Sequence, residues 1–416
     1  MVVRFYHINV VSLTHRFNRY CSNKSSFRDA LKSIRDRKFV PIRIRGFSLG
    51  DSFSRASIDF TKHLIDKNGN ITDIRSLPFD KTGDVFKRTV RFSSLFAEGI
   101  EELKLFSSGQ ELKDDQLSFA IHSFIYGFWN KRDYHENCLE NILTEEKENK
   151  ITVLLACHLF SKITNAMGRH YLVDEHISKF EVCPCKRKCG EKVEYGSVGI
   201  GSEYLWYGYP DILLSPPGGS KVGVNLAKKD DDEDRIPLSL EEKERQVLEV
   251  KINSKDLRNK FNVRQYIAQT LTFALYHKAM QLNHPQFASK RISIIPTIAV
   301  SSESFDIYMY DVENDILLRN DGDPIPLWKK ENGKNRLDLS SVLMLWMVVN
   351  HLSFKPSITN AGIEQMKGSC NFLSCFSSEE YETIEASVHM RSNFKPLHKE
   401  EIEAVDLPVD PVIEES

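Results

Sequence analysis

YLWYGYPDILL, residues 204–214, and QVLEVKINSK, residues 246–255, are the two segments of this 416-residue chain that decide its fold class. Asp211 begins the apolar run that closes the first segment, and Glu249 and Lys251 lie two positions apart in the second. Residues two apart in a strand point to the same face, so Glu249 and Lys251 are expected to project together. The pattern predicts two carboxylates and one ammonium at the ends of neighbouring strands.

These three groups suit one kind of chemistry. Two carboxylates form an oxygen-rich site for Mg²⁺ or Mn²⁺, which keep several waters and share their coordination with a phosphate. An ion held in this way lowers the pKa of bound water and offsets charge on the phosphate, and a neighbouring ammonium orients the attacking water. The residues therefore favour phosphodiester hydrolysis.

Pro210-Asp211 followed by Glu249-Val250-Lys251 resembles the signature of the PD-(D/E)xK nuclease superfamily. The resemblance implies an α/β fold, with a restriction-endonuclease-like mixed sheet flanked by helices. It also implies that Asp211 and Glu249 bind the metal ion together with the main-chain carbonyl of Val250. Lys251 is then the catalytic lysine.

A helix is expected downstream, over NVRQYIAQTLTFALYHKAM, residues 262–280. Apolar residues recur there at helical spacing, and a second stripe is polar and includes Gln265 and Gln269. That polar stripe resembles the helix motif of the lambda-exonuclease and recombination-nuclease branches, in which a glutamine and an aromatic residue four positions later support the active site. Gln269 with Phe273 fits this motif best, and Gln265 is the alternative. The competing interpretation is that these glutamines form a solvated helix face without a role in the site.

Residues 151–180 also read as a long helix, because apolar residues recur at every fourth position from Leu155 to Met167. The same nuclease branches carry an acidic residue or a histidine on a helix before the Asp strand. Glu175 is the first choice for an additional metal ligand or base, and His170 is the second. The competing interpretation is a surface helix that ends with mixed charges.

The composition, with 41% hydrophobic and 27% charged residues, indicates a globular chain with two domains or one domain with large extensions. The longest apolar run, Val342 to Val349, is too short to span a bilayer, so no membrane is expected. Net charge is only −2, but residues 251–291 hold eight Lys or Arg against one acid. This stretch predicts contacts with nucleic-acid phosphates, in DNA rather than RNA, unless it is simply a solvated face. The oligomeric state is left open.

The polar run Thr144–Lys150 marks a predicted boundary. It separates a mainly helical N-terminal accessory region, 1–150, from a nuclease-like core, 151–353, and a C-terminal segment, 354–416, whose acidic tail is expected to be disordered. Within the first region, Phe39–Phe47 alternates apolar and basic residues and predicts a strand. Pro296 predicts that its strand lies at an edge or is bulged.

Eight cysteines without a secretory signal favour free thiols in a reducing compartment. Cys183, Cys185 and Cys189 in CPCKRKCG are close enough to share one soft metal ion. His176 or Cys157 would complete a tetrahedral set for structural zinc. The alternative is a cysteine-bearing turn between the helix and the Asp strand.

The other signals narrow the function and the compartment. The chain has no acid before Asp29, which fits either a mitochondrial transit peptide or the basic start of a folded domain. An intracellular protein of the nucleus or cytoplasm is expected, with the mitochondrion as the alternative. No phosphate-binding GxxxxGK[ST], GxGxxG, HExxH or GxSxG motif is present. The sequence thus predicts a magnesium-dependent nuclease; the alternative is a catalytically inactive nuclease-fold protein that binds nucleic acid or acts as a scaffold.

Overall fold

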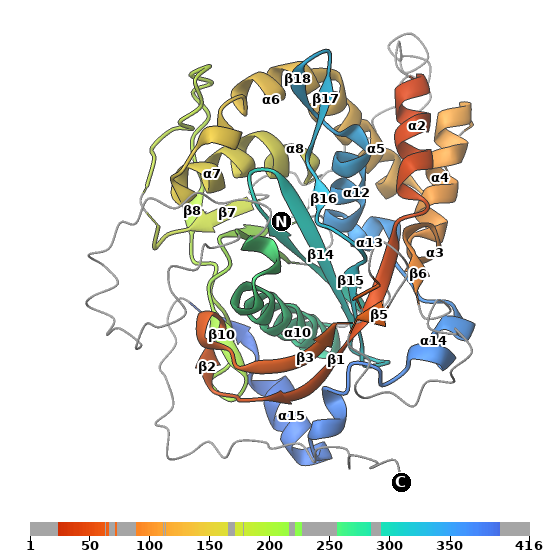
Figure 1. Ribbon diagram of the computed structural model, residues 1–416, viewed down its shortest axis with the longest axis vertical. Helices are drawn as coiled ribbons and strands as arrows, with labels where there is room; N and C mark the ends of the chain where they lie inside the picture. Colours follow the sequence, from red (N-terminus) through yellow and green to blue (C-terminus); the bar gives the residue numbers. More distant parts are fainter. Residues whose placement is uncertain are drawn as a thin grey trace, which may run out of the picture.

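The computed structural model describes residues 24–62, 64–65, 71–72, 89–110, 112, 114–164, 171–177, 179–215, 221–226, 256–283 and 293–391. Within these residues the main feature is a large mixed sheet wrapped by helices (Figure 1). Its strand order is β3-β1-β15-β14-β13-β12-β11-β7-β8, with β6 paired to β1 and β16 paired to β14. The predicted mixed sheet flanked by helices is confirmed, and the restriction-endonuclease-like arrangement stays a prediction.

The strands come from most of the chain. Those of the large sheet are β1 (Lys38–Phe47), β3 (Ile58–Lys62), β6 (Val90–Arg91), β7 (Tyr171–Asp174), β8 (Tyr195–Gly196), β11 (Ile212–Leu214), β12 (Val222–Leu226), β13 (Ile294–Val300), β14 (Ser304–Asp311), β15 (Ile316–Asn320) and β16 (Ile325–Pro326). A four-stranded sheet contains β19 (His389–Met390), β9 (Ile200–Gly201), β10 (Trp206–Gly208) and β2 (Asp51–Ser52). Two further pairs are β17 (Trp328–Glu331) with β18 (Lys334–Leu337), and β4 (Leu64–Ile65) with β5 (Ile71–Thr72). The N-terminal region is therefore not only helical: β1 and β3 join the large sheet, which takes strands from both sides of residue 150.

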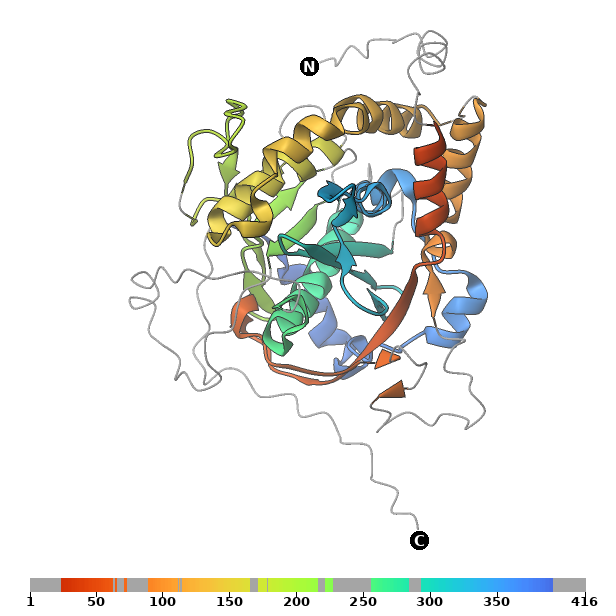
Figure 2. The same cartoon turned by 45° about the horizontal axis from the view of Figure 1, so that its top comes forward.

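The helices lie around this sheet. They are α2 (Lys24–Ile34), α3 (Phe92–Leu95), α4 (Ala97–Ser108), α5 (Asp115–Gly127), α6 (Arg132–Cys138), α7 (Glu148–Leu155), α8 (Ser161–Ile163), α10 (Lys260–Asn283), α12 (Leu339–Val349), α13 (His351–Phe354), α14 (Asn360–Met366) and α15 (Ser378–Ser387). A π-helical turn, η5 (Ala156–Phe160), joins α7 to α8. Short 3-10 turns are η1 (Phe53–Arg55), η3 (Trp129–Lys131), η4 (Ile142–Thr144), η6 (Asp256–Arg258) and η7 (Leu373–Cys375). In Figure 2 the orange and yellow helices arch along one side of the molecule, while β1 and β3, in red, curve along the other.

Helix α12 lies in the core because its sequence is apolar on every side. Every residue from Val342 to Val349 is buried. Asp338 caps the helix by accepting a hydrogen bond from the amide of Ser340 at 3.0 Å. No helix in the described part of the chain combines the length and the apolar character needed to cross a membrane.

Helix α10 is the crossover between β12 and β13, which pair in parallel and so cannot be joined by a tight turn. One side of α10 packs on β12, β13 and β14, and η1, β9, β10 and α15 also contact it. The helix is consequently enclosed, and even Gln269 and Thr272 are fully buried. The interpretation of its glutamines as a solvated face is wrong, because segments far away in the sequence cover that face.

Two further expectations need correction. The helix predicted over 151–180 ends at Ile163 in the described residues, and Tyr171–Asp174 forms strand β7, with Tyr171 and Val173 buried. Pro296 lies in the middle of the sheet rather than at an edge. It is opposite Met309 of β14, whereas pairing with β12 begins only at Ile298, so its missing N–H leaves no gap in that ladder.

Candidate functional site

Asp211 lies at the centre of a polar row across three neighbouring strands. It immediately precedes β11, and its carbonyl oxygen accepts a hydrogen bond from the amide of Asp174 at the end of β7, at 3.1 Å. On the other side the register pairs Ile212 with Val224, which places Asn225 of β12 opposite Asp211. Residues directly opposite each other in paired strands share a face. Asp174, Asp211 and Asn225 therefore form one row, called the polar row below.

The polar row is largely shielded from solvent. Asp211 is 7% exposed and its Oδ2 accepts a hydrogen bond from the amide of Leu226 at 2.8 Å. Asp174 is 8% exposed, and its Oδ1 accepts from the amide of His176 at 3.1 Å and lies 2.8 Å from His176 Nδ1. Asn225 is fully buried, and neither atom of its amide has a partner among the described residues. Carboxylates at opposite positions repel each other, so a cation on this face would stabilise the row.

Tyr266 of α10 is a further buried polar side chain whose ionisation Asp211 influences. Its side chain is buried and its hydroxyl has no hydrogen-bond partner in the described part of the chain. Burial raises the pKa of Tyr266 well above its usual range, and the charges of Tyr308, Asp211, Asp306 and Glu148 raise it further. Tyr266 also packs against Tyr308 of β14, with ring centroids 5.7 Å apart, so its phenol lies on the face of the sheet that carries the polar row.

Asp306 extends the polar row towards β14, because it is opposite Ala299, and Ala299 is beside Asn225. Its fully buried carboxylate accepts two hydrogen bonds from Arg258, from Nε at 2.7 Å and from Nη2 at 2.8 Å. A third comes from Asn320 Nδ2 at 2.7 Å. Arg258 belongs to η6, so this contact fixes the start of α10 at the same end of the sheet as Asp211.

Several predicted site residues lie outside the described residues: Glu249, Val250, Lys251 and His170. Both edges of β11 are occupied, by β7 and β12, and Asn225 of β12 lies opposite Asp211. Glu175 lies in the turn after β7 and is partly exposed. Burial, then the charges of Asp174 and Glu175, raises the pKa of Tyr209. Glu175 is therefore one position beyond the polar row, and Asp174 is the carboxylate that faces Asp211.

The two predicted glutamines differ in their surroundings. Gln269 is fully buried, and neither amide atom has a partner among the described residues. Gln265 is 8% exposed. Phe273, the aromatic residue paired with Gln269 in the sequence, packs on β12 at Gly223, where an added Cβ would lie 2.8 Å from the ring. Phe273 therefore has a packing role against the sheet.

The described cations of the basic stretch, residues 251–291, mostly make contacts within the fold. Four of its eight cations lie in the described residues, and Lys260 among them is exposed. The other three make intramolecular contacts: Arg258 with Asp306, Arg264 with the carbonyl oxygen of Ile58, and Lys278 with the hydroxyl of Tyr381. A phosphate-binding surface on this stretch stays a prediction.

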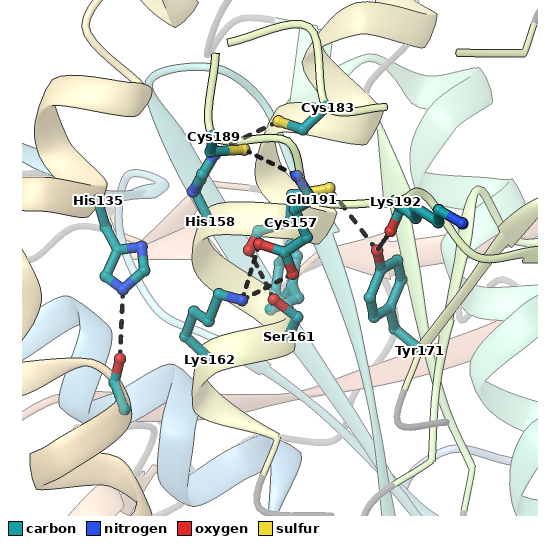
Figure 3. A network of polar contacts seen from close by, with 12 residues as sticks. His135, Cys157, His158, Ser161, Lys162, Tyr171, Cys183, Cys189, Glu191 and Lys192 are labelled. Carbon is teal, nitrogen blue, oxygen red and sulfur yellow. Dashed lines mark hydrogen bonds and ion pairs between the residues drawn. The ribbon is translucent and has the colours of Figure 1, made fainter. Parts of the chain in front are cut away.

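A second cluster lies apart from the polar row, where His158 of η5 meets Cys183, Cys185 and Cys189. Figure 3 labels His158, Cys183 and Cys189 of this cluster. The four candidate ligand atoms all lie within 4.8 Å of one another, so this Cys3His cluster can hold a metal ion such as Zn²⁺. The three cysteines match the sequence prediction, but the fourth ligand does not. The side chain of His176 is hydrogen-bonded to Asp174, and the Sγ of Cys157 lies 3.6 Å from the hydroxyl of Tyr171. His158 is the fourth candidate ligand instead.

The Cys3His cluster is buried, and this controls its protonation. Burial, and then electrostatic interactions with His135 and Lys162, lowers the pKa of His158 to about 3, so the imidazole is neutral. Burial raises the pKa of Cys189 to about 12. Burial also opposes ionisation of Cys185, but hydrogen bonds from Cys189 outweigh it and the pKa of Cys185 is lowered. Metal binding would displace the remaining thiol protons.

Sequence reasoning missed His158, Asp174 and Asn225. His158 is a lone histidine in an apolar helical run. The direction of its side chain depends on the π-helical turn, a feature found at many functional sites. Asp174 was predicted to lie in a helix. Asn225 lies opposite Asp211 only because of the register between β11 and β12. Comparisons of the chain with protein-family models, curated proteins and solved structures found no significant match.

Proposed function

We propose that this protein is a metal-dependent nuclease that hydrolyses phosphodiester bonds, with DNA as the substrate. The observation that carries the proposal is the polar row, in which two carboxylates and an amide line one face of three neighbouring strands. Hard oxygen ligands of this kind suit Mg²⁺ or Mn²⁺. The row lies at the end of the sheet, beside an enclosed helix that carries further polar groups.

The ends of the segment 227–255 add support, because this segment carries the Glu-Val-Lys part of the resemblance. Leu226, the last described residue before it, donates its amide to Asp211. Arg258, just after it, is held by Asp306 at the same end of the sheet. Lys251 precedes Arg258 by seven positions, a length of chain that spans at most about 25 Å. The described residues that flank the segment, Leu226 and Arg258, therefore contact Asp211 and Asp306 at the same end of the sheet.

In this proposal Asp211, Glu249 and the main-chain carbonyl of Val250 hold the divalent ion, and Asp174 supplies an additional carboxylate. A divalent ion held by these residues would supply a water molecule of lowered pKa and would offset charge on the phosphate. Lys251 orients the attacking water towards phosphorus.

Of the two predicted glutamines, Gln265 is the better placed to contact a substrate strand. Gln269 is enclosed on all sides within the described part of the chain. Its side-chain amide, which has no partner among the described residues, instead suits a supporting role inside the fold.

One observation favours a second candidate function, a nuclease-fold protein that binds nucleic acid without cutting it. Asn225, which is uncharged, lies opposite Asp211, where a carboxylate would strengthen binding of a divalent ion. In this case the polar row would help to position DNA, and turnover would be absent.

Cleavage assays separate the two functions. The protein is incubated with end-labelled and circular DNA and RNA, single- and double-stranded, in Mg²⁺, Mn²⁺ or EDTA. The proposal predicts metal-dependent cutting of DNA that falls at least about 100-fold in Asp211→Asn and Lys251→Ala, because the stabilisation of phosphate charge by the ion is worth several kcal/mol.

Asp311→Asn is the matched control. Asp311 is also a buried aspartate of the sheet, but it is opposite Ile294, at the far end of β13 from Asp211. This variant should cut like wild type. Wild-type protein that binds DNA and never cuts it in either metal would favour the second function, and equal losses in Asp211→Asn and Asp311→Asn would mean general destabilisation.

A further inference from the structure

Three thiols and one imidazole converge in the Cys3His cluster with the dimensions of a single tetrahedral metal site. The Sγ of Cys183 lies 3.2 Å from Nε2 of His158, and all four ligand atoms lie within 4.8 Å of one another. Zinc–sulfur bonds of about 2.3 Å place two sulfurs of one tetrahedral ion about 3.8 Å apart. A two-iron cluster would distribute the same four ligands over two ions and so spread them farther.

We propose that His158, Cys183, Cys185 and Cys189 bind one structural Zn²⁺ ion, which ties the cysteine loop, residues 181–193, to the helical run of residues 148–163. All four tetrahedral positions are filled by protein atoms, and three of the four side chains are buried. A site without an open coordination position is the structural type rather than the catalytic type. This site is separate from the polar row and does not depend on nuclease activity.

The cysteine loop is folded around the ligands. The amide of Lys188 donates to the carbonyl of Cys185 at 3.0 Å, and the amide of Cys183 donates to the carbonyl of Glu191 at 2.8 Å. Two amides point at sulfur: that of Cys189 lies 3.4 Å from the Sγ of Cys185, and that of Glu191 lies 3.5 Å from the Sγ of Cys189. Such donors stabilise thiolate charge, as groups around metal ligands commonly do.

The loop needs a tie of this kind because it has little regular structure. Its backbone has one isolated bridge, Val182 with Lys192, and Lys188 adopts a positive φ of 49°. The ion pair between Lys162 and Glu191, at 2.7 and 2.9 Å, joins loop and helix outside the cluster (Figure 3). The loop leads into β8, which pairs with β7, so the proposed ion supports the strand that carries Asp174.

The test measures metal directly in full-length protein purified in buffers without chelators. Elemental analysis should find one zinc per chain, and the protein should lack the visible absorbance of an iron–sulfur cluster. After exchange with Co²⁺, the spectrum should show the strong visible bands of tetrahedral cobalt and the ultraviolet charge-transfer bands of thiolate ligands. This spectrum needs no variant, so it tests the proposal even where a substitution prevents folding.

Variants then assign the ligands. Cys189→Ser and His158→Gln should lower bound zinc at least tenfold, whereas Cys375→Ser, at a partly buried thiol outside the cluster, should retain one zinc per chain. Cys157→Ser should also retain zinc, because that thiol is not among the four ligand atoms that converge. A wild-type protein that takes up neither zinc nor cobalt overturns the proposal, as does iron with visible absorbance, or undiminished zinc in both Cys189→Ser and His158→Gln.

Discussion

Replacing Arg258 by methionine should destabilise the folded protein by about 3–5 kcal/mol, the usual effect of removing one partner from a buried ion pair. The side chain of Asp306 is fully buried and accepts two hydrogen bonds from Arg258, at 2.7 and 2.8 Å. Without the guanidinium, Asn320 is the donor that remains of these three contacts. The variant therefore keeps a buried charge that has lost its counter-ion.

The measurement is chemical unfolding at pH 7, with fluorescence and circular dichroism followed together so that a non-cooperative transition is recognised. Lys260→Met is the matched control, since Lys260 is exposed and only two positions away; its effect should stay within about 0.5 kcal/mol. The double variant Arg258→Met with Asp306→Leu should recover much of the loss, because it removes the unpaired charge. A loss below about 1 kcal/mol in Arg258→Met would refute the reasoning.

Two other predictions address packing and pH. Gly223→Ala should destabilise by about 1–3 kcal/mol in chemical unfolding, because its Cβ would lie 2.8 Å from the buried ring of Phe273; wild-type stability would show that α10 can shift freely. Burial, aided by the charge of Lys221, lowers the pKa of His277 to about 4, whereas its unfolded value is about 6.5. Between about pH 4 and 6.5 the unfolded state therefore binds more protons than the folded state, so stability falls as pH drops through this window. His277 contributes at most about 1.4 kcal/mol per pH unit to this fall, and it has no effect on stability above about pH 6.5. Thermal unfolding of wild type and His277→Gln from pH 7 to 4.5 checks this, and equal slopes would contradict it.

Local patterns in the sequence were enough for the elements whose surroundings match their own composition. Alternating apolar and basic residues predicted β1, and the uniformly apolar run from Val342 to Val349 forms the buried part of α12. The helix predicted after residue 260 is confirmed as α10, because its apolar residues recur with a helical period. In each of these elements the local sequence pattern and the tertiary contacts favour the same secondary structure.

The remaining features depend on pairing over long distances, which no local pattern encodes. The polar stripe of α10 was compatible with a solvated helix face. Strands and helices from other parts of the chain cover its glutamines in the folded protein. Asn225 is a candidate site residue only because the register of β12 places it opposite Asp211. The three cysteines were visible from their spacing, but His158 joins them from 25 residues away through the fold.

Binding of Mn²⁺ to the zinc-loaded protein, followed by electron paramagnetic resonance without any nucleic acid, is the most direct test of a divalent-ion site at Asp211. Wild type and Asp311→Asn should each bind one Mn²⁺ per chain, and Asp211→Asn should bind it at least about tenfold more weakly, as expected when a charged ligand is lost. Equal Mn²⁺ affinity in wild type and Asp211→Asn would contradict the account.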